Sequence, residues 1–138
     1  MAITSLMVDT SAYSAFKRGH SGVVDALQRA RSILIPVIVL GELLAGFEIG
    51  TQREDNRSEL DAFRENPRVR LVRITGDTAK LYANIFAYLR RIGRPIPTND
   101  LWIAAACMEH GAELLTLDAH FADIPQIILY RSKKIHGD

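Results

Sequence analysis

The sequence predicts an α/β fold in which a short, mainly parallel sheet of about five strands carries helices on both faces. Two observations support this fold class. Short apolar runs of strand length alternate with longer helical segments along the whole chain. The composition is that of a globular protein, with 138 residues that are 48% apolar and 24% charged, and without a repeat or a linker. We therefore expect one domain over residues 1–138, with a core at about 3–130 and a basic tail at 131–138.

The first half of the chain contains two predicted strands and two predicted helices. The apolar run Ile3–Val8 has the length of a strand and ends at Asp-Thr-Ser, a typical helix start. Residues 32–35 form a second apolar run, directly before a proline. Residues 37–50, VIVLGELLAGFEIG, predict a largely buried helix, and residues 52–65 predict a charged amphipathic helix.

The second half continues the alternation. A strand is expected at residues 70–74, and Thr75 with Asp77 or Thr78 begins a helix that runs to about Ile92. Two prolines order the loop GRPIPTND, after which Asn99 or Asp100 begins a helix that Gly111 ends. The remaining expected elements are a strand at 113–117, a helical turn at 118–122 and a last strand at 126–130.

Four carboxylates follow predicted strands or begin the helices next to them: Asp9, Glu42, Asp100 and Asp118. The carboxyl ends of parallel strands lie at one edge of the sheet, which is where α/β proteins bind ligands. Several carboxylates at that edge repel one another unless a hard cation lies between them, and oxygen ligands suit Mg²⁺ or Mn²⁺. The expected chemistry is phosphodiester hydrolysis, because such ions also take phosphate oxygens as ligands.

Each carboxylate also has a purely structural interpretation. Asp9, Asp100 and Asp118 all stand where a helix N-cap would stand. Glu42 lies on a helix that is apolar on nearly all sides, so it needs a partner, either a metal or an arginine of residues 52–73.

Charge and targeting signals narrow the class of protein further. The formal net charge is only +1, but the balance becomes positive once the four carboxylates are assigned to a metal, which would suit a polyanionic substrate. Cys107 is the single cysteine, as is usual in a reducing compartment. Asp9 interrupts the N-terminal apolar run before a signal peptide or a membrane span could form. We expect a cytoplasmic protein that does not contact membranes.

The four acidic motifs together resemble the PIN-domain ribonucleases, and most of all the VapC toxins of toxin–antitoxin pairs. The motifs are Asp9-Thr-Ser, Glu42 in LGELLAG, Asp100 in NDLWIAAAC and Asp118 in LLTLDAHF. The resemblance implies an endoribonuclease that uses Mg²⁺ or Mn²⁺, with an RNA substrate, a cognate VapB-like antitoxin and a homodimeric state. Many relatives carry an acidic residue where this chain has His120.

The resemblance also assigns roles within the site. Asp9, Asp100 and Asp118 would hold the metal, and Glu42 would orient the attacking water or complete a second metal shell. Three polar residues would support these carboxylates from beside the pocket: Thr116, Asn99 and Ser11.

Other residues have two interpretations each. Arg91 and Arg94 either contact RNA phosphates or form the charged end of a helix. Trp102 is expected in the core rather than against an RNA base. In the resembling family the helices around residues 43–49 help to form the antitoxin groove, so these apolar residues are either core or an exposed patch.

Two alternative functions remain open at this stage. One is a PIN-like scaffold that binds RNA or a partner without cutting, and the other is a receiver-like phosphoacceptor domain. Metal-dependent cleavage would separate an enzyme from both.

Overall fold

Five parallel strands form one sheet in the computed structural model, which describes residues 3–137. The strands lie in the order β3-β2-β1-β4-β5, so that β1 is central. Each pairing is parallel, with Val8 of β1 opposite Leu115 of β4. The strand bounds are β1 Ile3–Val8, β2 Ala30–Pro36, β3 Val69–Val72, β4 Glu113–Leu115 and β5 Ile128–Leu129.

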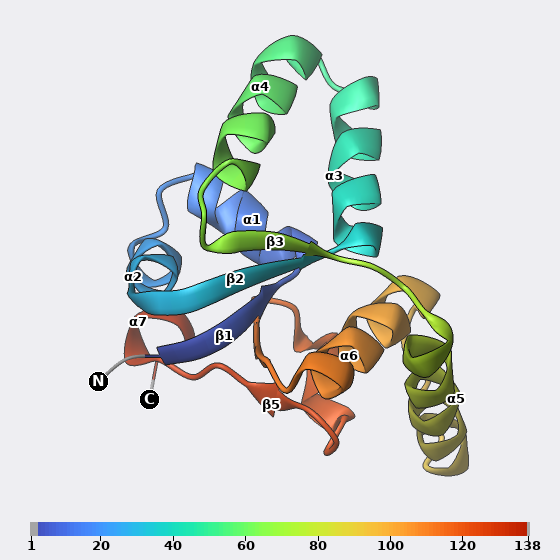
Figure 1. The fold of residues 1–138 in the computed structure, drawn as a ribbon. Helices are drawn as coiled ribbons and strands as arrows, with labels where there is room; N and C mark the ends of the chain where they lie inside the picture. The colour runs from blue at the N-terminus through green and yellow to red at the C-terminus, as the bar shows by residue number, and fades with distance from the viewer. Residues whose placement is uncertain (1–2, 138) are drawn as a thin grey trace.

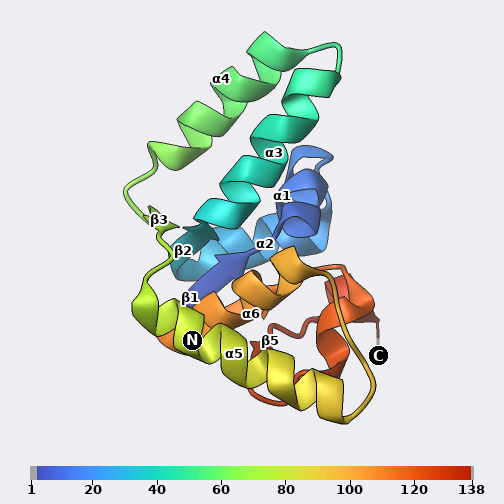
Figure 2. The same cartoon turned by 90° about the vertical axis from the view of Figure 1, so that its right-hand side faces the viewer.

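The sheet lies between two groups of helices (Figures 1 and 2). On one side are α1, α3 and α4, and on the other α5 and α6 run next to each other. The helices are α1 Thr10–Lys17, α2 Ser21–Arg29, α3 Val37–Ile49, α4 Arg53–Arg64, α5 Gly76–Arg91, α6 Thr98–His110, the 3-10 helix η1 Ala119–Asp123 and α7 Lys133–His136. The three-layer α/β fold class expected from the sequence is confirmed.

Local signals account for most of the helix boundaries. Asp9 caps α1 by accepting from the backbone N–H of Ala12. Thr75 and Thr78 form a reciprocal capping box at the start of α5. Gly111 ends α6 in the left-handed region at φ +60°, which glycine adopts without strain. The first of these caps also fixes the Asp9 side chain at the end of β1.

Several predicted boundaries differ from the structure. The fourth strand ends at Leu115, because residues 116–118 turn away to carry polar side chains across the end of the sheet. Helix α6 begins at Thr98 behind Pro97, so Asp100 lies in its first turn and is not its N-cap. Residues 133–136, in the expected basic tail, form α7 against α2.

Helix α3 is not largely buried, contrary to the prediction. Only Val39 and Leu43 are buried, and Ile49 is 89% exposed. Figures 1 and 2 show the reason, since α3 and α4 form a hairpin that stands away from the sheet. Leu44 and Phe47 pack partly against the core, so the apolar face of α3 has only part of its area covered.

The core centres on β1 and on the Ala-rich α6. Leu6, Met7 and Val8 are almost fully buried, and so is Cys107, as expected for a small apolar side chain. Trp102 differs from its prediction, because it is half-buried and stacks on Tyr82 of α5 with ring centroids 4.2 Å apart. No helix within residues 3–137 combines the length and the apolar character needed to cross a membrane.

Candidate metal centre

Three side chains from two parts of the chain converge at the carboxyl edge of the sheet. Asp100 comes from the first turn of α6, whereas Asp118 and His120 come from the segment after β4. One ligand atom from each lies within 4.8 Å of the other two. Two carboxylate oxygens and an imidazole nitrogen at this spacing are a donor set that fits a divalent cation.

The turn after β4 holds its two members of this group together. Asp118 caps the 3-10 helix η1 by accepting at Oδ1 from the backbone N–H of His120 at 2.9 Å. The His120 ring turns back toward the carboxylates, with Nδ1 2.7 Å from Asp100 Oδ2 and 3.2 Å from Asp118 Oδ1. The N-cap interpretation of Asp118 is therefore correct, and the same geometry exposes its carboxylate to Asp100.

Asp9 lies deeper, at the end of β1, and is only 4% exposed. Its Oδ1 accepts from the Ser11 hydroxyl at 2.7 Å and from the Ala12 N–H at 2.8 Å, and its Oδ2 accepts from the Thr116 hydroxyl. Burial raises the pKa of Asp9, and these hydrogen bonds oppose that rise. The negative charge of Asp118 raises the Asp9 pKa further, so the two carboxylates are close enough to repel each other.

Two hydroxyls connect the ends of β1 and β4. Thr116 accepts from the Asp118 N–H at 2.9 Å, and Ser11 accepts from the Leu117 N–H at 3.0 Å. The two hydroxyl oxygens are 3.3 Å apart. This network fixes Asp9 relative to the turn that carries Asp118, which is the position expected of supporting residues.

Glu42 has a different environment from the one predicted. It is half-exposed on α3, and its partners are neutral side chains rather than an arginine. Thr10 donates to Oε1 at 2.5 Å, and Asn99 donates from its side-chain amide to Oε2 at 3.0 Å. Because Asn99 directly precedes Asp100, this second bond ties α3 to the start of α6 beside the metal-type cluster.

The electrostatics of the cluster favour a bound cation. Burial raises the pKa of Asp100, and the charges of Asp118 and Glu42 raise it further, against the hydrogen bond from His120. That hydrogen bond, together with the charge of Asp118, raises the pKa of His120. A group of carboxylates that resists ionisation in this way is stabilised when a positive charge binds among them.

The structure thus divides the four expected acidic residues into two pairs. Asp100 and Asp118 lie together with His120, whereas Asp9 and Glu42 are outside that three-residue group and have protein donors of their own. Sequence reasoning treated His120 only as a departure from the acidic pattern. Its position two residues after Asp118, within the same cap, was the signal that it could reach the site.

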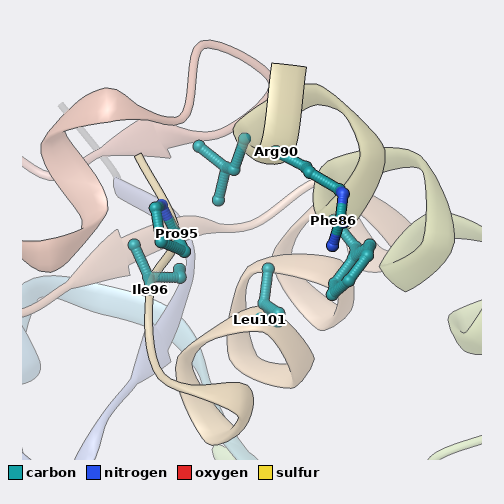
Figure 3. Close-up of a pocket in the computed structure, with 6 residues that line it drawn as sticks. Phe86, Arg90, Pro95, Ile96 and Leu101 are labelled. Carbon is teal, nitrogen blue, oxygen red and sulfur yellow. The ribbon is translucent and has the colours of Figure 1, made fainter. Parts of the chain in front are cut away.

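The expected RNA-contacting arginines lie beside the loop that precedes α6. Arg91 is exposed at the end of α5, and Arg94 is exposed and 3.5 Å from Asp123 of η1. An apolar pocket of about 220 Å³ lies under this loop, between α5 and Leu101 (Figure 3). Arg90 is the charged residue among those that line this pocket, and the other lining residues are apolar. The pocket is therefore distinct from the cluster of Asp100, Asp118 and His120.

Comparison with known proteins identifies the family. The PIN domain model matches residues 6–127. Ribonuclease VapC2 of Rickettsia felis is 31% identical over 107 residues, which are 77% of this chain and 78% of that protein. Ribonuclease VapC4 of Mycobacterium tuberculosis is 29% identical over 93 residues, 67% of this chain and 72% of its own.

A solved structure supports the same assignment. The crystal structure of VapBC2 from Rickettsia felis, bound to a DNA fragment from their promoter, contains a chain that matches with a TM-score of 0.81 at 27% identity. The match covers 91% of this chain and 97% of that one. This protein belongs to the PIN-domain family and, within it, to the VapC ribonucleases. The receiver-like alternative is thereby set aside.

Proposed function

We propose that this protein is a metal-dependent endoribonuclease, the toxin of a VapBC-type pair, and that it acts in the cytoplasm. The observation that carries the proposal is the convergence of Asp100, Asp118 and His120 at the carboxyl edge of a PIN-domain sheet. A donor set of this kind has its natural use in phosphodiester hydrolysis.

A divalent cation, Mg²⁺ or Mn²⁺, would be held by Asp100 and Asp118, with Asp9 behind them. When bound, such a cation lowers the pKa of water and screens the negative charge that grows on the phosphate oxygens. In its ionised form the buried Asp9, held by three hydrogen bonds, would strengthen the field that attracts the cation.

The chain's other polar residues orient the reactants. Glu42 accepts from Thr10 and Asn99, which fix the direction of its two oxygens, and it would orient the attacking water. Thr116 and Ser11 hold Asp9 in one rotamer. Arg91 at the end of α5 and Arg94 in the loop before α6 are exposed and would bind the phosphates of an RNA strand.

The partners we propose are an antitoxin and a second copy of the chain. A pocket of about 220 Å³ between α1, α3 and α4 is a suitable antitoxin groove, with Leu43 and Phe47 as apolar walls. Within residues 3–137, the buried hydroxyl of Tyr13 in this pocket lacks a hydrogen-bond partner. Burial raises the pKa of Tyr13 to about 12, so the hydroxyl keeps its proton and is available to donate. Exposed Phe86 supplies apolar surface for a homodimer.

The test is cleavage of a small-RNA pool by purified, antitoxin-free protein with Mg²⁺, with Mn²⁺ and with EDTA. Discrete cuts should require the metal and should fall by at least about a hundredfold in Asp100→Asn. Asp77→Asn, which removes an exposed carboxylate from the first turn of α5, is the matched control and should cut normally.

Two outcomes would contradict the proposal. Folded, antitoxin-free protein that cuts no RNA with either metal would favour the non-catalytic scaffold. Cutting that survives in Asp100→Asn would mean that the activity belongs to a contaminant or to a different site.

A further inference from the structure

His120 lies between two carboxylates that come from different elements. Its Nδ1 is 2.7 Å from Asp100 Oδ2 on α6 and 3.2 Å from Asp118 Oδ1 in its own turn. The imidazole is half-exposed, so the core does not hold it in this orientation. Its own backbone N–H bonds to Asp118, which fixes the ring's starting point at the edge of the site.

These spacings are those of neighbouring ligands on one octahedral ion. With metal–ligand bonds of about 2.1 Å, two ligands at right angles stand about 3.0 Å apart. One of the distances from Nδ1 to the two carboxylate oxygens is slightly shorter than this value, at 2.7 Å, and the other is slightly longer, at 3.2 Å. All three atoms lie within 4.8 Å of one another. The three groups can therefore face one cation without rearrangement of the backbone. Binding releases to solvent the proton that Nδ1 shares with Asp100, and the imidazole keeps its remaining proton on Nε2.

The hydrogen-bond partners of the acidic residues also favour a cation beside Asp100 and His120. Asp9 accepts from three protein donors and Glu42 from two, out of the roughly four lone pairs that a carboxylate offers. Among the described residues, the Asp100 side chain has His120 as its hydrogen-bond partner. The Asp100 carboxylate, which His120 faces, therefore keeps more of its lone pairs open to a cation than Asp9 or Glu42 does.

We propose that His120 is a direct nitrogen ligand of the catalytic cation and makes the centre prefer first-row transition ions over Mg²⁺. This inference rests on the proposed metal-dependent function and deepens it. Imidazole suits transition ions, whereas Mg²⁺ prefers oxygen ligands. A neutral imidazole in place of a third carboxylate also removes one negative charge from the cluster, which weakens the purely electrostatic attraction on which Mg²⁺ depends.

The direct test is pulsed electron paramagnetic resonance of Mn²⁺ bound to the purified full-length protein. The wild-type spectrum should show nitrogen hyperfine coupling to an imidazole, and His120→Asn should lose it. His110→Asn is the matched control, because His110 also lies beside a carboxylate, 3.8 Å from Glu109, but outside the cluster. That variant should keep the coupling.

The second test is the ratio of Mn²⁺ to Mg²⁺ affinity, measured by calorimetric titration. His120→Asp restores an oxygen ligand and a charge, and should lower the ratio by about tenfold or more. A wild-type spectrum without nitrogen coupling, coupling that persists in His120→Asn, or an unchanged ratio in His120→Asp would each overturn the inference.

These measurements require no RNA, so the inference and the proposed function can fail separately. Nitrogen coupling in a protein that cuts no RNA would support the ligand assignment and remove the nuclease. Metal-dependent cutting by a protein without nitrogen coupling would support the nuclease and remove the role of His120.

Discussion

The hydroxyl of Thr116 donates to Oδ2 of Asp9 across a separation of 107 residues. The hydroxyl oxygen of Thr116 also accepts from the backbone N–H of Asp118 at 2.9 Å. One buried hydroxyl thus joins the carboxylate at the end of β1 to the turn that carries a second carboxylate after β4. The spacing between the two acidic residues depends on this side chain together with that of Ser11.

Replacing Thr116 by valine keeps the shape of the side chain and removes the hydroxyl. Asp9 then loses a donor in a buried setting and the Asp118 N–H loses its acceptor, so the free energy of unfolding should fall by about 1–3 kcal/mol. RNA cleavage should fall as well, because one of the two hydroxyls that tie Asp9 to the Asp118 turn is lost. Urea denaturation and initial cleavage rates measure the two effects.

Thr116→Ser is the matched control, since it keeps the hydroxyl and removes only a methyl group. It should retain most of the stability and the activity. A valine variant as stable and as active as the serine variant would mean that the hydroxyl does not hold the two carboxylates together.

The pH dependence of stability should reveal the buried charge of Asp9. Burial raises its folded-state pKa, so the folded protein keeps a proton that the unfolded chain has released. The stabilising contribution of this group is present below the ordinary value of about 4 and is lost as the pH rises through the raised pKa. Asp9→Asn lacks this loss, so in EDTA its stability relative to wild type should increase from pH 4 to pH 8.

Urea unfolding of both proteins at several pH values gives this difference directly. Asp77→Asn, at an exposed site, should run nearly parallel to wild type. A difference between Asp9→Asn and wild type that stays constant, or that shrinks as the pH rises, would contradict the assignment of a raised pKa.

Asn99 should act through Glu42 rather than through the fold. Asn99 is exposed, and its amide donates to Glu42 Oε2 at 3.0 Å. Asn99→Ala frees the carboxylate to rotate, so kcat should fall about tenfold with little change in KM, while stability changes by less than about 0.5 kcal/mol. Thr98→Ala, one residue earlier on the same exposed turn, should leave kcat unchanged, and an equal loss in both variants would point to damage at the start of α6.

Gly22 is the point where α2 touches the C-terminal helix. A Cβ at this position would stand 2.7 Å from Ile135 Cγ1 and 2.9 Å from the backbone carbon of Lys134. Gly22→Ala should therefore displace α7 and lower the free energy of unfolding by about 1–3 kcal/mol. Gly46→Ala on α3, where an added Cβ meets nothing within 4 Å, should instead stabilise the protein by about 0.5–1 kcal/mol.

Hydrogen exchange of the α7 amides locates the effect of Gly22→Ala. Exchange should accelerate at residues 133–137 in this variant and remain as in wild type in Gly46→Ala. Unchanged α7 exchange in a destabilised Gly22→Ala protein would mean that the strain is relieved within α2.

The elements that sequence predicts well are those with local chemical signals. Asp9 and Thr75 cap helices through bonds to residues three positions away, and Gly111 ends α6 by its own backbone freedom. Such signals involve only neighbours in the chain. The alternation of strands and helices, and hence the sheet edge that holds the carboxylates, follows from them.

The features that sequence missed depend on residues that are distant in the chain. Glu42 finds its partners 32 and 57 residues away, at Thr10 and Asn99, so no local pattern indicates a neutral rather than a cationic partner. An apolar helix such as α3 has the same composition whether its side chains pack in the core or remain on the surface, as Ile49 does. Composition alone therefore does not distinguish the two cases. His120 is recognised as a site residue only in the folded chain, where α6 places Asp100 within hydrogen-bond distance of it.

The link from Thr116 to Asp9 also determines when, during synthesis of the chain, the acidic site can be assembled. Asp9 directly follows β1, whereas Thr116, Asp118 and His120 come 107 residues or more later in the chain. Until these residues have been made, β1 lacks its β4 neighbour, and the cluster of Asp100, Asp118 and His120 lacks two of its three members. A nascent chain that has not yet reached these residues thus carries only part of the centre, and whatever cleavage the centre performs can begin only after they have been synthesised.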